Sequence, residues 1–577
     1  MSVAIYRGRT LFLCLAIFSL FLLLAFQLVC IQMMENPVLD DKAEGQHCVN
    51  MRVEAKRGRI FDCSKKVLAM SVPVKSVYAD PKLVPEPALA AKKLSAVLGA
   101  GERALEERLR RKKRFVWLAR KVDDETAARV DMLSLEGIYL TDEMKRFYPN
   151  AELLSHVLGF VGIDNDGLEG MELYADAFLR GKPGWRAIVR DGKRREILPF
   201  RSQDIPPVDG RDIILTIDAV IQNIAEVELD KAFREFNAKG GSCIVMRPGT
   251  GDILAMANVP PYNPNDVGAS LMESRRNRAM TDMLEPGSTF KVITGAAALD
   301  RGAVVMDDVF FCENGAFRTH GRTLHDHHPY GNLSFLQVIQ KSSNIGAAKV
   351  GMRLGEEGLH SYIRRFGFGE PTGIDLRGEA AGIVHPLNRW SKLSISRIPM
   401  GHEISVTPLQ MICAVSAIAN GGFLMKPRII DGIVDSEGNV LRSFTPRVRR
   451  QVIGEESSRC MVEVMKAVVS DQGTARRAVL EGYTAAGKTG TAQKIEEDGR
   501  YSHRYFFGSF VGFAPADDPA IAVIVVLDEP RPVYYGGTVA APVFRSVSQK
   551  VLSYLGVPQE VPDVELAEGA IAAGSRI

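Results

Sequence analysis

The pattern of apolar and polar positions begins with a nearly continuous apolar run from Leu11 to Ile31, which only Ser19 and Gln27 interrupt. A run of this length is sufficient to cross a bilayer as a helix. Arginines precede it and acidic residues follow it, so the positive-inside rule predicts a cytoplasmic tail over residues 1–10, an anchor over 11–31 and export of the chain from residue 32 onward. The flanking charges are Arg7, Arg9, Glu35, Asp40 and Asp41.

Two alternatives to an uncleaved anchor are a cleaved signal peptide and a lipidated cysteine. The apolar run is longer than a usual signal core, and no small-x-small cleavage site follows it directly. Gln27, Leu28 and Val29 are not the small residues expected just before a lipidated cysteine, which would here be Cys30. The pattern therefore favours a single retained anchor, and we expect no second span downstream.

Beyond the anchor, the elements up to residue 205 are predicted to be short and mixed. Residues 57–69 are typical of a strand, a turn and a second strand, and residues 86–112 have a helical pattern. A turn-rich Pro206-Pro207-Val208-Asp209-Gly210 precedes a predicted strand from Ile213 to Ile217. The block that ends near residue 555 alternates strands, such as 521–527, with helices, such as 290–299, and the acidic tail over 556–577 is predicted to be flexible.

Composition narrows the class of protein. A chain of 577 residues is too long for one hydrophobic core, and 46% hydrophobic with 24% charged residues is typical of globular domains. A net charge of +3 is small for this length and indicates no nucleic-acid partner. The 8 cysteines are scattered and form no CxxC pair, so they predict no disulfide framework, although a single bridge stays open.

Three short strings carry the candidate chemistry, and each supplies a different part of one acyl-transfer site. A serine with a lysine three residues later is typical of an activated nucleophile, because positions three apart share one face of a helix. Pro286-Gly287 and the apolar positions that follow predict that this serine lies at a helix N-terminus. The strings are Ser288-Thr289-Phe290-Lys291, Ser342-Ser343-Asn344 and Lys488-Thr489-Gly490-Thr491.

Lysine is a poor base at neutral pH because it is protonated, so Lys291 would need a lowered pKa. Burial and a neighbouring cation would both lower it, and we expect Lys488 to be that cation. Ser342 is a candidate proton relay and Asn344 a candidate amide contact with the substrate, although a helix cap is the alternative interpretation of this string. An SxxK or an SxN string alone would be weak evidence for an acyl-transfer site. The occurrence of all three strings in this order in one chain is specific evidence for such a site.

The third string is predicted to lie on the first strand of a β-hairpin between Tyr483 and Phe507. A strand edge with a glycine can pair with an extended peptide, and Lys488 with the hydroxyls of Thr489 and Thr491 could hold a terminal carboxylate. The backbone N–H groups of Ser288 and Thr491 are the candidates for an oxyanion hole. A purely structural hairpin is the alternative, but it gives no reason for a lysine between glycines.

Together the strings resemble the active-site motifs of class B penicillin-binding proteins, the monofunctional D,D-transpeptidases of peptidoglycan synthesis. The likeness covers roughly residues 50 to 550 and includes segments outside the motifs. Tyr78-Ala79-Asp80-Pro81 and the compact length are more similar to the septal, FtsI-type enzyme than to the elongation enzyme. Other segments that carry the resemblance are 57–60, 146–149, 156–159, 170–172, 250–257, 277–289, 406–410 and 537–544.

The resemblance implies a mixed α+β fold. It implies a membrane anchor, an elongated N-terminal pedestal or dimerisation domain over 32–205, and a serine transpeptidase (penicillin-binding, β-lactamase-like) domain over 206–555. A central antiparallel sheet flanked by helices is expected in the second domain. The chain departs from the family at Asp62-Cys63-Ser64-Lys65, in a pedestal turn, and at 400–404, where His402 and Glu403 make a rim loop more charged than expected.

The resemblance also implies the reaction and its participants. Ser288 would attack the penultimate D-Ala of a stem peptide while Lys291 takes its proton, and Ser342 would help the terminal D-Ala to leave. Asn344 and Lys488 complete the expected catalytic set, and Thr489, Gly490 and Thr491 the substrate-binding set. No metal and no organic cofactor are expected. Expected partners are peptidoglycan stem peptides, β-lactams and membrane division proteins, including a lipid II glycan polymerase, on the periplasmic side of the cytoplasmic membrane.

Several alternatives remain beside this interpretation. An elongation-type transpeptidase, a β-lactamase or β-lactam sensor, and a non-catalytic scaffold of the division machinery share some of the features. Class A lactamases carry a Glu-x-x-Leu-Asn string, but the position that corresponds to its glutamate, three residues before Leu387-Asn388, is Val384. An intact serine–lysine pair argues against a scaffold.

Two weaker patterns have simple explanations. A group of histidines with Cys312 and Asp326 has no recognised zinc spacing and predicts a polar loop rather than a metal site. The basic run Arg108 to Arg114 predicts a solvated helix end or a contact with the anionic envelope. The histidines are His320, His325, His327 and His328.

Overall fold

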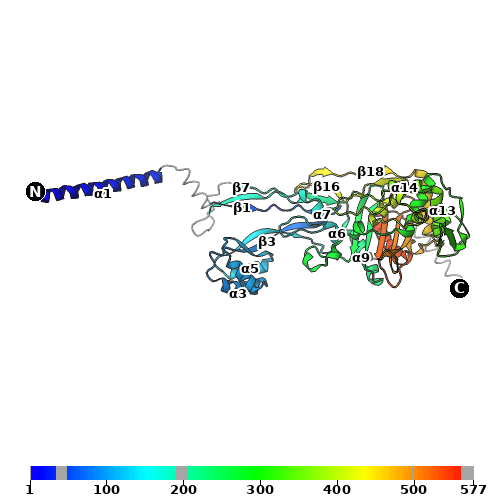
Figure 1. The fold of residues 1–577 in the computed structure, drawn as a ribbon, viewed down its shortest axis with the longest axis horizontal. Helices are drawn as coiled ribbons and strands as arrows, with labels where there is room; N and C mark the ends of the chain where they lie inside the picture. The colour runs from blue at the N-terminus through cyan, green and yellow to red at the C-terminus, as the bar shows by residue number, and fades with distance from the viewer. Residues whose placement is uncertain (1, 34–47, 190–203, 497, 561–577) are drawn as a thin grey trace. The chain divides into compact units, whose positions relative to one another are not determined.

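A computed structural model of the chain describes residues 2–33, 48–189, 204–496 and 498–560 (Figure 1). The chain divides into two compact units, one made of residues 1–55 with 181–209 and the other of residues 56–180 with 210–577. The first unit contains helix α1 (Ser2–Met33) and an antiparallel sheet in the order β1-β6-β7. Its strands are β1 (Cys48–Val53), β6 (Gly184–Val189) and β7 (Asp204–Ile205).

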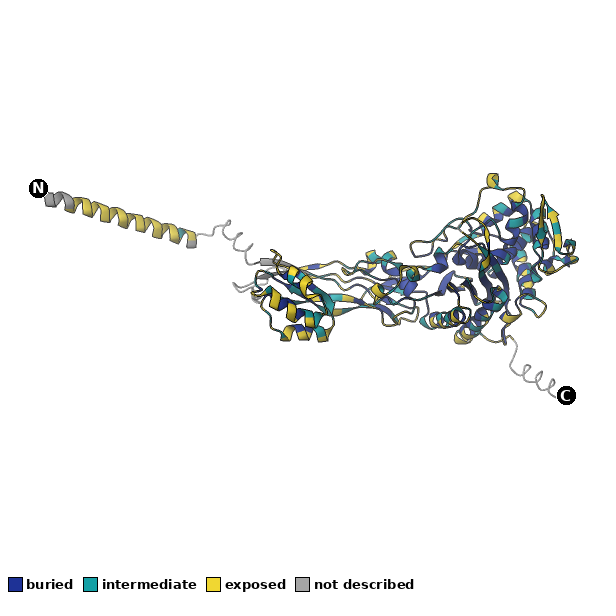
Figure 2. Cartoon of the chain, turned by 60° about the horizontal axis from the view of Figure 1, so that its bottom comes forward, coloured by how far each residue is buried: buried dark blue, intermediate teal, exposed yellow. Residues whose placement is uncertain are grey.

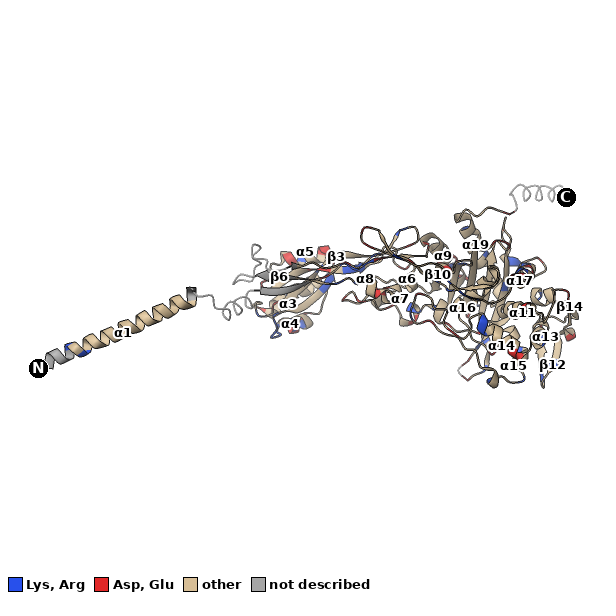
Figure 3. Cartoon of the chain, turned by 90° about the horizontal axis from the view of Figure 1, so that it is seen from above, with Lys and Arg blue, Asp and Glu red and all other residues tan. Residues whose placement is uncertain are grey.

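Helix α1 is the one described helix long and apolar enough to cross a membrane, over Arg7–Ile31. Its charged residues, Arg7 and Arg9, lie at its N-terminal end, and the rest of the span is uncharged (Figure 3). This agrees with a single-pass membrane anchor at the predicted position. The acidic flank at Glu35, Asp40 and Asp41 and most of the predicted tail, 561–577, lie outside the described residues.

The part of the second unit over 56–180 holds a small lobe with its own core. In that lobe a three-stranded antiparallel arrangement, β4-β3-β5, is covered by helices whose apolar side chains include Leu94, Leu105 and Val130. The predicted helical stretch 86–112 is two helices, because Gly99, with φ 64°, ends the first and Gly101 precedes the second. The elements are β2 (Ile60–Phe61), β3 (Val67–Ala79), α3 (Pro87–Leu98), α4 (Glu102–Leu109), β4 (Val116–Val122), α5 (Asp124–Met132), β5 (Ile138–Phe147), α6 (Ser155–Leu158), α7 (Gly170–Tyr174) and α8 (Asp176–Leu179).

A buried ion network joins separate segments of this part of the chain. The carboxylate of Glu172 accepts hydrogen bonds from Arg57 Nε at 2.6 Å and from Arg146 Nε at 2.6 Å. Arg57 also reaches Asp176 at 2.6 Å, and Arg146 donates to the carbonyl of Gly58 at 2.7 Å. Arg57, Arg146 and Glu172 are all buried away from water, so each charge is stabilised by its ion-pair and hydrogen-bond partners. Three of the segments that carry the family resemblance therefore meet in one network.

A larger sheet connects this part to the rest of the unit. Strand β8 (Asp212–Leu215) runs parallel to β2 and antiparallel to β16 (Ile430–Val434), whose other neighbour is β17 (Val440–Ser443). The strand predicted after the turn-rich boundary is therefore present, and it pairs with a strand from each side of that boundary.

The catalytic-domain candidate is built on a five-stranded antiparallel sheet in the order β10-β9-β21-β20-β19. Every residue of β10 and β21 is buried, and so is all of β9 except its last, which means that helices cover both faces (Figure 2). Helices α9 and α19 pack together on one face, and α16 packs on the other beside α11 and α17. The predicted antiparallel sheet flanked by helices is confirmed. These elements are α9 (Ala219–Glu235), β9 (Gly240–Arg247), β10 (Asp252–Val259), α11 (Lys291–Asp300), α16 (Pro408–Ala419), α17 (Glu455–Val468), β19 (Ala486–Ile495), β20 (Tyr501–Ala514), β21 (Ile521–Asp528) and α19 (Ala541–Tyr554).

Shorter elements surround this sheet. The α-helices are α10 (Arg278–Thr281), α12 (Phe335–Gln340), α13 (Asn344–Leu354), α14 (Glu356–Arg365), α15 (Ser394–Arg397) and α18 (Gly536–Val539). The 3-10 helices are η2 (Val267–Ala269), η3 (Met272–Arg275), η4 (Gly287–Phe290), η5 (Glu313–Gly315), η6 (Leu387–Arg389), η7 (Ile398–Met400) and η8 (Arg476–Ala478). The strands are β11 (Val309–Phe311), β12 (Ala316–Thr319), β13 (Arg322–His325), β14 (Asn332–Ser334), β15 (Phe423–Met425) and β18 (Val448–Gln451).

The first residues of the predicted flexible tail are held by the fold. The backbone N–H of Glu560 donates to the carbonyl of Gly482 at 2.9 Å, and the hydroxyl of Tyr483 donates to the carbonyl of Val557 at 2.9 Å. Flexibility therefore remains a prediction for residues 561–577 alone.

Candidate active site

The candidate nucleophile lies in a tight turn. Ser288 is the second residue of η4, which leads directly into α11, and its side chain is partly exposed. Gly287 has φ 54°, and its backbone N–H donates to the carbonyl of Gly401 at 3.2 Å. A side chain on Gly401 would clash, because its Cβ would lie 2.2 Å from the carbonyl oxygen of Gly287. The serine therefore projects from a turn whose backbone is held closely from behind, as the sequence predicted for a helix start.

Lys291 is the first residue of α11 and is fully buried. Its amine donates to the carbonyl of Ser342 at 2.6 Å, to Asn344 Oδ1 at 2.7 Å and to Ser342 Oγ at 3.2 Å. Burial lowers the pKa of Lys291 to about 7, against a smaller opposing effect of the Asp326 carboxylate. The amine is therefore available as a base near neutral pH.

Of the two causes expected for the lowered pKa of Lys291, burial is the one found, and the charge of Lys488 is not. Lys488 is itself fully buried, which lowers its pKa well below the ordinary value, and the charge of Lys291 lowers it further. Two ammonium groups in one buried site repel each other, so the pair titrates as a unit that avoids the doubly charged state.

Ser342 joins the two lysines. Its hydroxyl accepts from Lys291 at 3.2 Å and from Lys488 at 3.1 Å, while its φ of 59° places the residue in the left-handed region. The helix-cap interpretation also holds, but for the neighbouring residue: Ser343 caps α13 and accepts from the N–H of Gly346 at 2.9 Å. One string therefore supplies a cap and, beside it, a hydroxyl that bridges two amines.

Asp326 was not predicted as a site residue, yet it holds the second string in place. Its carboxylate accepts from Ser343 Oγ at 2.6 Å, from the backbone N–H of Ile345 at 3.1 Å and from that of Asn344. The carbonyl of His325 accepts from Asn344 Nδ2 at 3.0 Å. No local pattern could have found this role, because Asp326 lies in a separate loop after β13.

The same loop contains the histidines considered for a metal site. Among the residues that the structure describes, no group of three or more His, Cys, Asp and Glu side chains is arranged to hold a metal ion. The charge of Lys291 affects His327 in this loop: burial lowers the pKa of that histidine, and the charge of Lys291 lowers it further. The seven cysteines whose side chains are described are unpaired thiols.

The third string lies on β19, the edge strand of the central sheet, in the predicted hairpin with β20. Thr489 Oγ1 lies 3.2 Å from Thr474 Oγ1, and Thr491 Oγ1 accepts from the N–H of Gly536 at 3.1 Å. At Gly490 a Cβ would lie 2.8 Å from the Thr289 methyl and 3.1 Å from the Pro286 carbonyl. The glycine is therefore required by close packing of the nucleophile turn on one side and of β20 on the other, where the Cβ would lie 2.4 Å from Ser509 Oγ.

The structure thus gathers all eight predicted residues around one turn and one strand edge. Within the described residues, Ser288 Oγ has no hydrogen-bond partner, and the Lys291 amine contacts the second string instead. Hydrogen bonds of catalytic groups often tighten only when substrate binds, so this geometry is compatible with proton transfer from Ser288. The chemistry it can perform is attack by a serine hydroxyl beside buried amines of lowered pKa.

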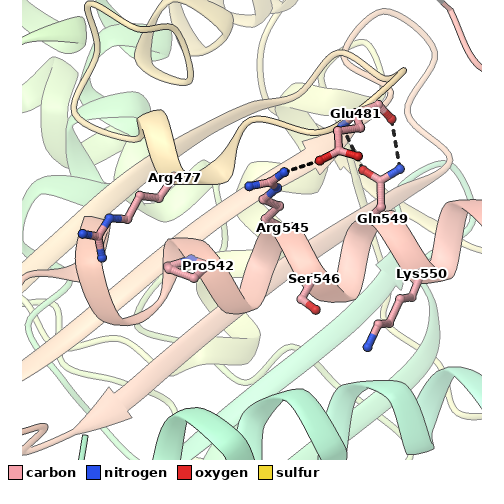
Figure 4. Close-up of a pocket in the computed structure, with 7 residues that line it drawn as sticks. All are labelled: Arg477, Glu481, Pro542, Arg545, Ser546, Gln549 and Lys550. Atoms are coloured by element: carbon pink, nitrogen blue, oxygen red, sulfur yellow. Dashed lines mark hydrogen bonds and ion pairs between the residues drawn. The ribbon is translucent and has the colours of Figure 1, made fainter. Parts of the chain in front are cut away.

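A cavity of about 480 Å³ lies elsewhere, along α19 (Figure 4). Three of its polar side chains contact one another: Arg545 pairs with Glu481 at 2.5 Å, and Gln549 Nε2 donates to the carbonyl of Glu481 at 2.9 Å. Lys550 pairs with Glu228 at 2.7 Å. None of the eight predicted residues lines this cavity, and we do not attribute the chemistry to it. The lining residues are Arg477, Glu481, Pro542, Arg545, Ser546, Gln549 and Lys550.

Comparison with known proteins agrees with this geometry. A family model of the penicillin binding protein transpeptidase domain matches residues 241–549, and one of the penicillin-binding protein dimerisation domain matches residues 52–215. Stage V sporulation protein D of Bacillus subtilis is 37% identical over 97% of this chain and 88% of its own length. Peptidoglycan D,D-transpeptidase FtsI of Escherichia coli is 35% identical over 88% of this chain and 85% of its own.

A solved structure extends the likeness to the fold. The crystal structure of penicillin binding protein 3 from Mycobacterium tuberculosis, complexed with aztreonam, has a TM-score of 0.70 and 27% sequence identity. The match covers 89% of this chain and 99% of that chain. The family predicted from the three strings is confirmed. The chain belongs to the penicillin-binding protein transpeptidase family and is a class B, FtsI-like member of it.

Proposed function

We propose that this chain is a peptidoglycan D,D-transpeptidase that cross-links stem peptides through an acyl-enzyme on Ser288. The observation that carries the proposal is the convergence of two fully buried lysines, Lys291 and Lys488, on the hydroxyl of Ser342 beside the Ser288 turn. Relatives that carry the name peptidoglycan D,D-transpeptidase support the same activity.

In the proposed first step, Ser288 Oγ attacks the carbonyl of the penultimate D-Ala, and the neutral amine of Lys291 takes the hydroxyl proton. Backbone N–H groups of Ser288 and Thr491 stabilise the developing oxyanion. The C–N bond then breaks, and the terminal D-Ala leaves with a proton relayed by Ser342 from one of the two lysines. An ester between Ser288 and the donor peptide remains.

In the second step, an amine of a neighbouring stem peptide attacks that ester. The attacking amine loses a proton to the lysine pair, and Ser288 leaves as a hydroxyl, so the site returns to its starting state. Before the terminal D-Ala leaves, Asn344 would hold the donor amide, while Lys488 with Thr489 and Thr491 would hold the terminal carboxylate at the edge of β19. β-Lactams would acylate the same serine, because they resemble the D-Ala-D-Ala end of the donor, and the aztreonam complex of a related protein supports this expectation.

We assign the reaction to septal wall synthesis during division, on the periplasmic side of the membrane that α1 would span. The 35% identity with FtsI supports the septal role, and membrane division proteins with a lipid II glycan polymerase are the partners this role would require. A sporulation role is the second candidate, because the relative that is 37% identical is named Stage V sporulation protein D. Depletion separates the roles: filaments support division, rounded cells an elongation role, and normal growth with failed sporulation the second candidate.

The activity itself is tested with a fluorescent penicillin and with cross-linking of lipid II-derived glycan strands. Wild type should be labelled at Ser288 and should form cross-links, whereas Ser288→Ala should do neither. Rapid multiple turnover of nitrocefin would instead indicate a β-lactamase. A folded wild type that takes no label would favour a non-catalytic scaffold.

A further inference from the structure

The carboxylate of Glu285, three residues before Ser288, lies where three segments meet. Its Oε2 accepts from His402 Nδ1–H at 2.7 Å. Its Oε1 accepts from the backbone N–H of Glu403 at 2.9 Å and from the hydroxyl of Tyr501 at 2.9 Å. Three donors from two distant segments thus converge on one buried side chain.

Each of these segments is connected to an element that carries candidate site residues. Residues 401–403 belong to the rim loop that the sequence marked as unusually charged, and Gly401 of this loop packs on the backbone of Gly287. Tyr501 is the first residue of β20 and pairs with Ile495, at the tip of the hairpin whose other strand carries Lys488. Glu285 therefore joins the nucleophile turn to the loop behind it and to the tip of the hairpin beside it.

The hairpin tip has little else to hold it against the nucleophile turn. Ile495 is 55% exposed and Tyr501 36% exposed, whereas the strand nearer Lys488 is buried. Among the described residues, the bond from Tyr501 to Glu285 is the side-chain hydrogen bond that links this tip to the turn. The ring of Tyr501 also meets that of His402 edge-on, with ring centroids 5.6 Å apart. The contact is therefore a three-way latch, made of Glu285, His402 and Tyr501.

We infer that Glu285 is a positioning residue for acylation, an inference that rests on the proposed role of Ser288. Through Tyr501 and His402 it holds the β19–β20 hairpin and the rim loop against the Ser288 turn. It thereby fixes the spacing between the nucleophile and the strand edge that presents Lys488 and Thr491. Productive geometry in acyl transfer depends on such spacing to within a fraction of an ångström, so the latch acts on the chemical step rather than on initial binding.

The first test replaces the hydroxyl alone. Tyr501→Phe keeps the ring and removes one hydrogen bond, and Tyr505→Phe, further along the same strand, is the matched control. Stopped-flow acylation by a fluorescent penicillin separates the acylation rate constant k2 from the dissociation constant Ks. We expect Tyr501→Phe to lower k2 about five- to tenfold, the effect of one hydrogen bond, with Ks within about twofold of wild type. Tyr505→Phe should match wild type, and the melting temperatures of both variants should stay close to it.

The second test asks whether the residues act through one contact. Glu285→Ala removes the acceptor and should lower k2 at least as much as Tyr501→Phe. The double variant should be no worse than Glu285→Ala, because both changes remove the same bond. An unchanged k2 in Tyr501→Phe, a change confined to Ks, or independent losses that multiply in the double variant would each overturn the inference. If Glu285→Ala does not fold, the k2-against-Ks comparison for Tyr501→Phe decides alone.

Different results would refute the proposed function of the chain and the proposed positioning role of Glu285. A folded wild type that is not acylated, or a Ser288→Ala variant that still is, refutes the proposed function. A wild type that is acylated at the same k2 as Tyr501→Phe leaves that function standing and removes the latch.

Discussion

The buried amine of Lys291 makes a specific prediction about how acylation depends on pH. Burial lowers the pKa of this lysine to about 7, and the amine must be neutral to take the proton of Ser288. Lys488 shares the hydroxyl of Ser342 with it, so a second positive charge in the site is disfavoured. Acylation should therefore follow the loss of a single proton from the lysine pair.

The size of the effect follows from the fraction of neutral amine. With a pKa of about 7, about 1% of the enzyme is competent at about pH 5 and about 90% at about pH 8, which is roughly a 90-fold rise in rate. An ordinary, exposed lysine would behave differently. Its rate would continue to rise about tenfold per pH unit until about pH 10.

The assay is the second-order rate constant for acylation by a fluorescent penicillin, measured from about pH 5 to about pH 9 at constant ionic strength. Ser288→Ala gives the background at each pH, and thermal unfolding shows over which range the protein stays folded. A rate that changes less than about threefold between about pH 5 and pH 8 would refute the role of Lys291 as base, and so would one that still rises tenfold between about pH 8 and pH 9.

Three further predictions concern burial and positioning. Because the pKa of Lys291 is lower in the folded than in the unfolded chain, the unfolded chain binds more protons between about pH 7 and pH 10.5, and wild type should gain stability relative to Lys291→Met as pH rises through that window. Urea unfolding at several pH values measures this, and a constant difference would contradict it. Glu172→Gln leaves the buried guanidinium group of Arg146 without its counter-charge and leaves Arg57 with Asp176 alone, so it should cost about 3–5 kcal/mol of unfolding free energy. A loss below about 1 kcal/mol in denaturant unfolding would show that the network is dispensable. Asp326→Asn weakens the charge-assisted hydrogen bonds that orient the second string and should lower k2 for penicillin about tenfold, with unchanged k2 as the contrary result.

Residue spacing and local sequence patterns were sufficient to predict most residues of the candidate site. The spacing of Ser288 and Lys291 places them one helical turn apart, and the glycines around Lys488 indicate a strand that another backbone approaches closely. The hairpin, the helix start and the membrane-spanning helix also depend on neighbouring residues, so they could be predicted without a fold. The single helical stretch expected over 86–112 was wrong in detail, because two glycines between α3 and α4 break it.

The amino-acid sequence by itself determined which chemical groups this protein has, and the order of the three strings determined its family. Only the tertiary structure decided how those groups affect one another, because pKa shifts and hydrogen bonds depend on distances through space. Burial of Lys291, the bridge from Ser342 to Lys488, and the carboxylates of Asp326 and Glu285 all arise between segments far apart in the chain. No periodicity encodes such contacts, since they exist only once the sheet and its helices have packed.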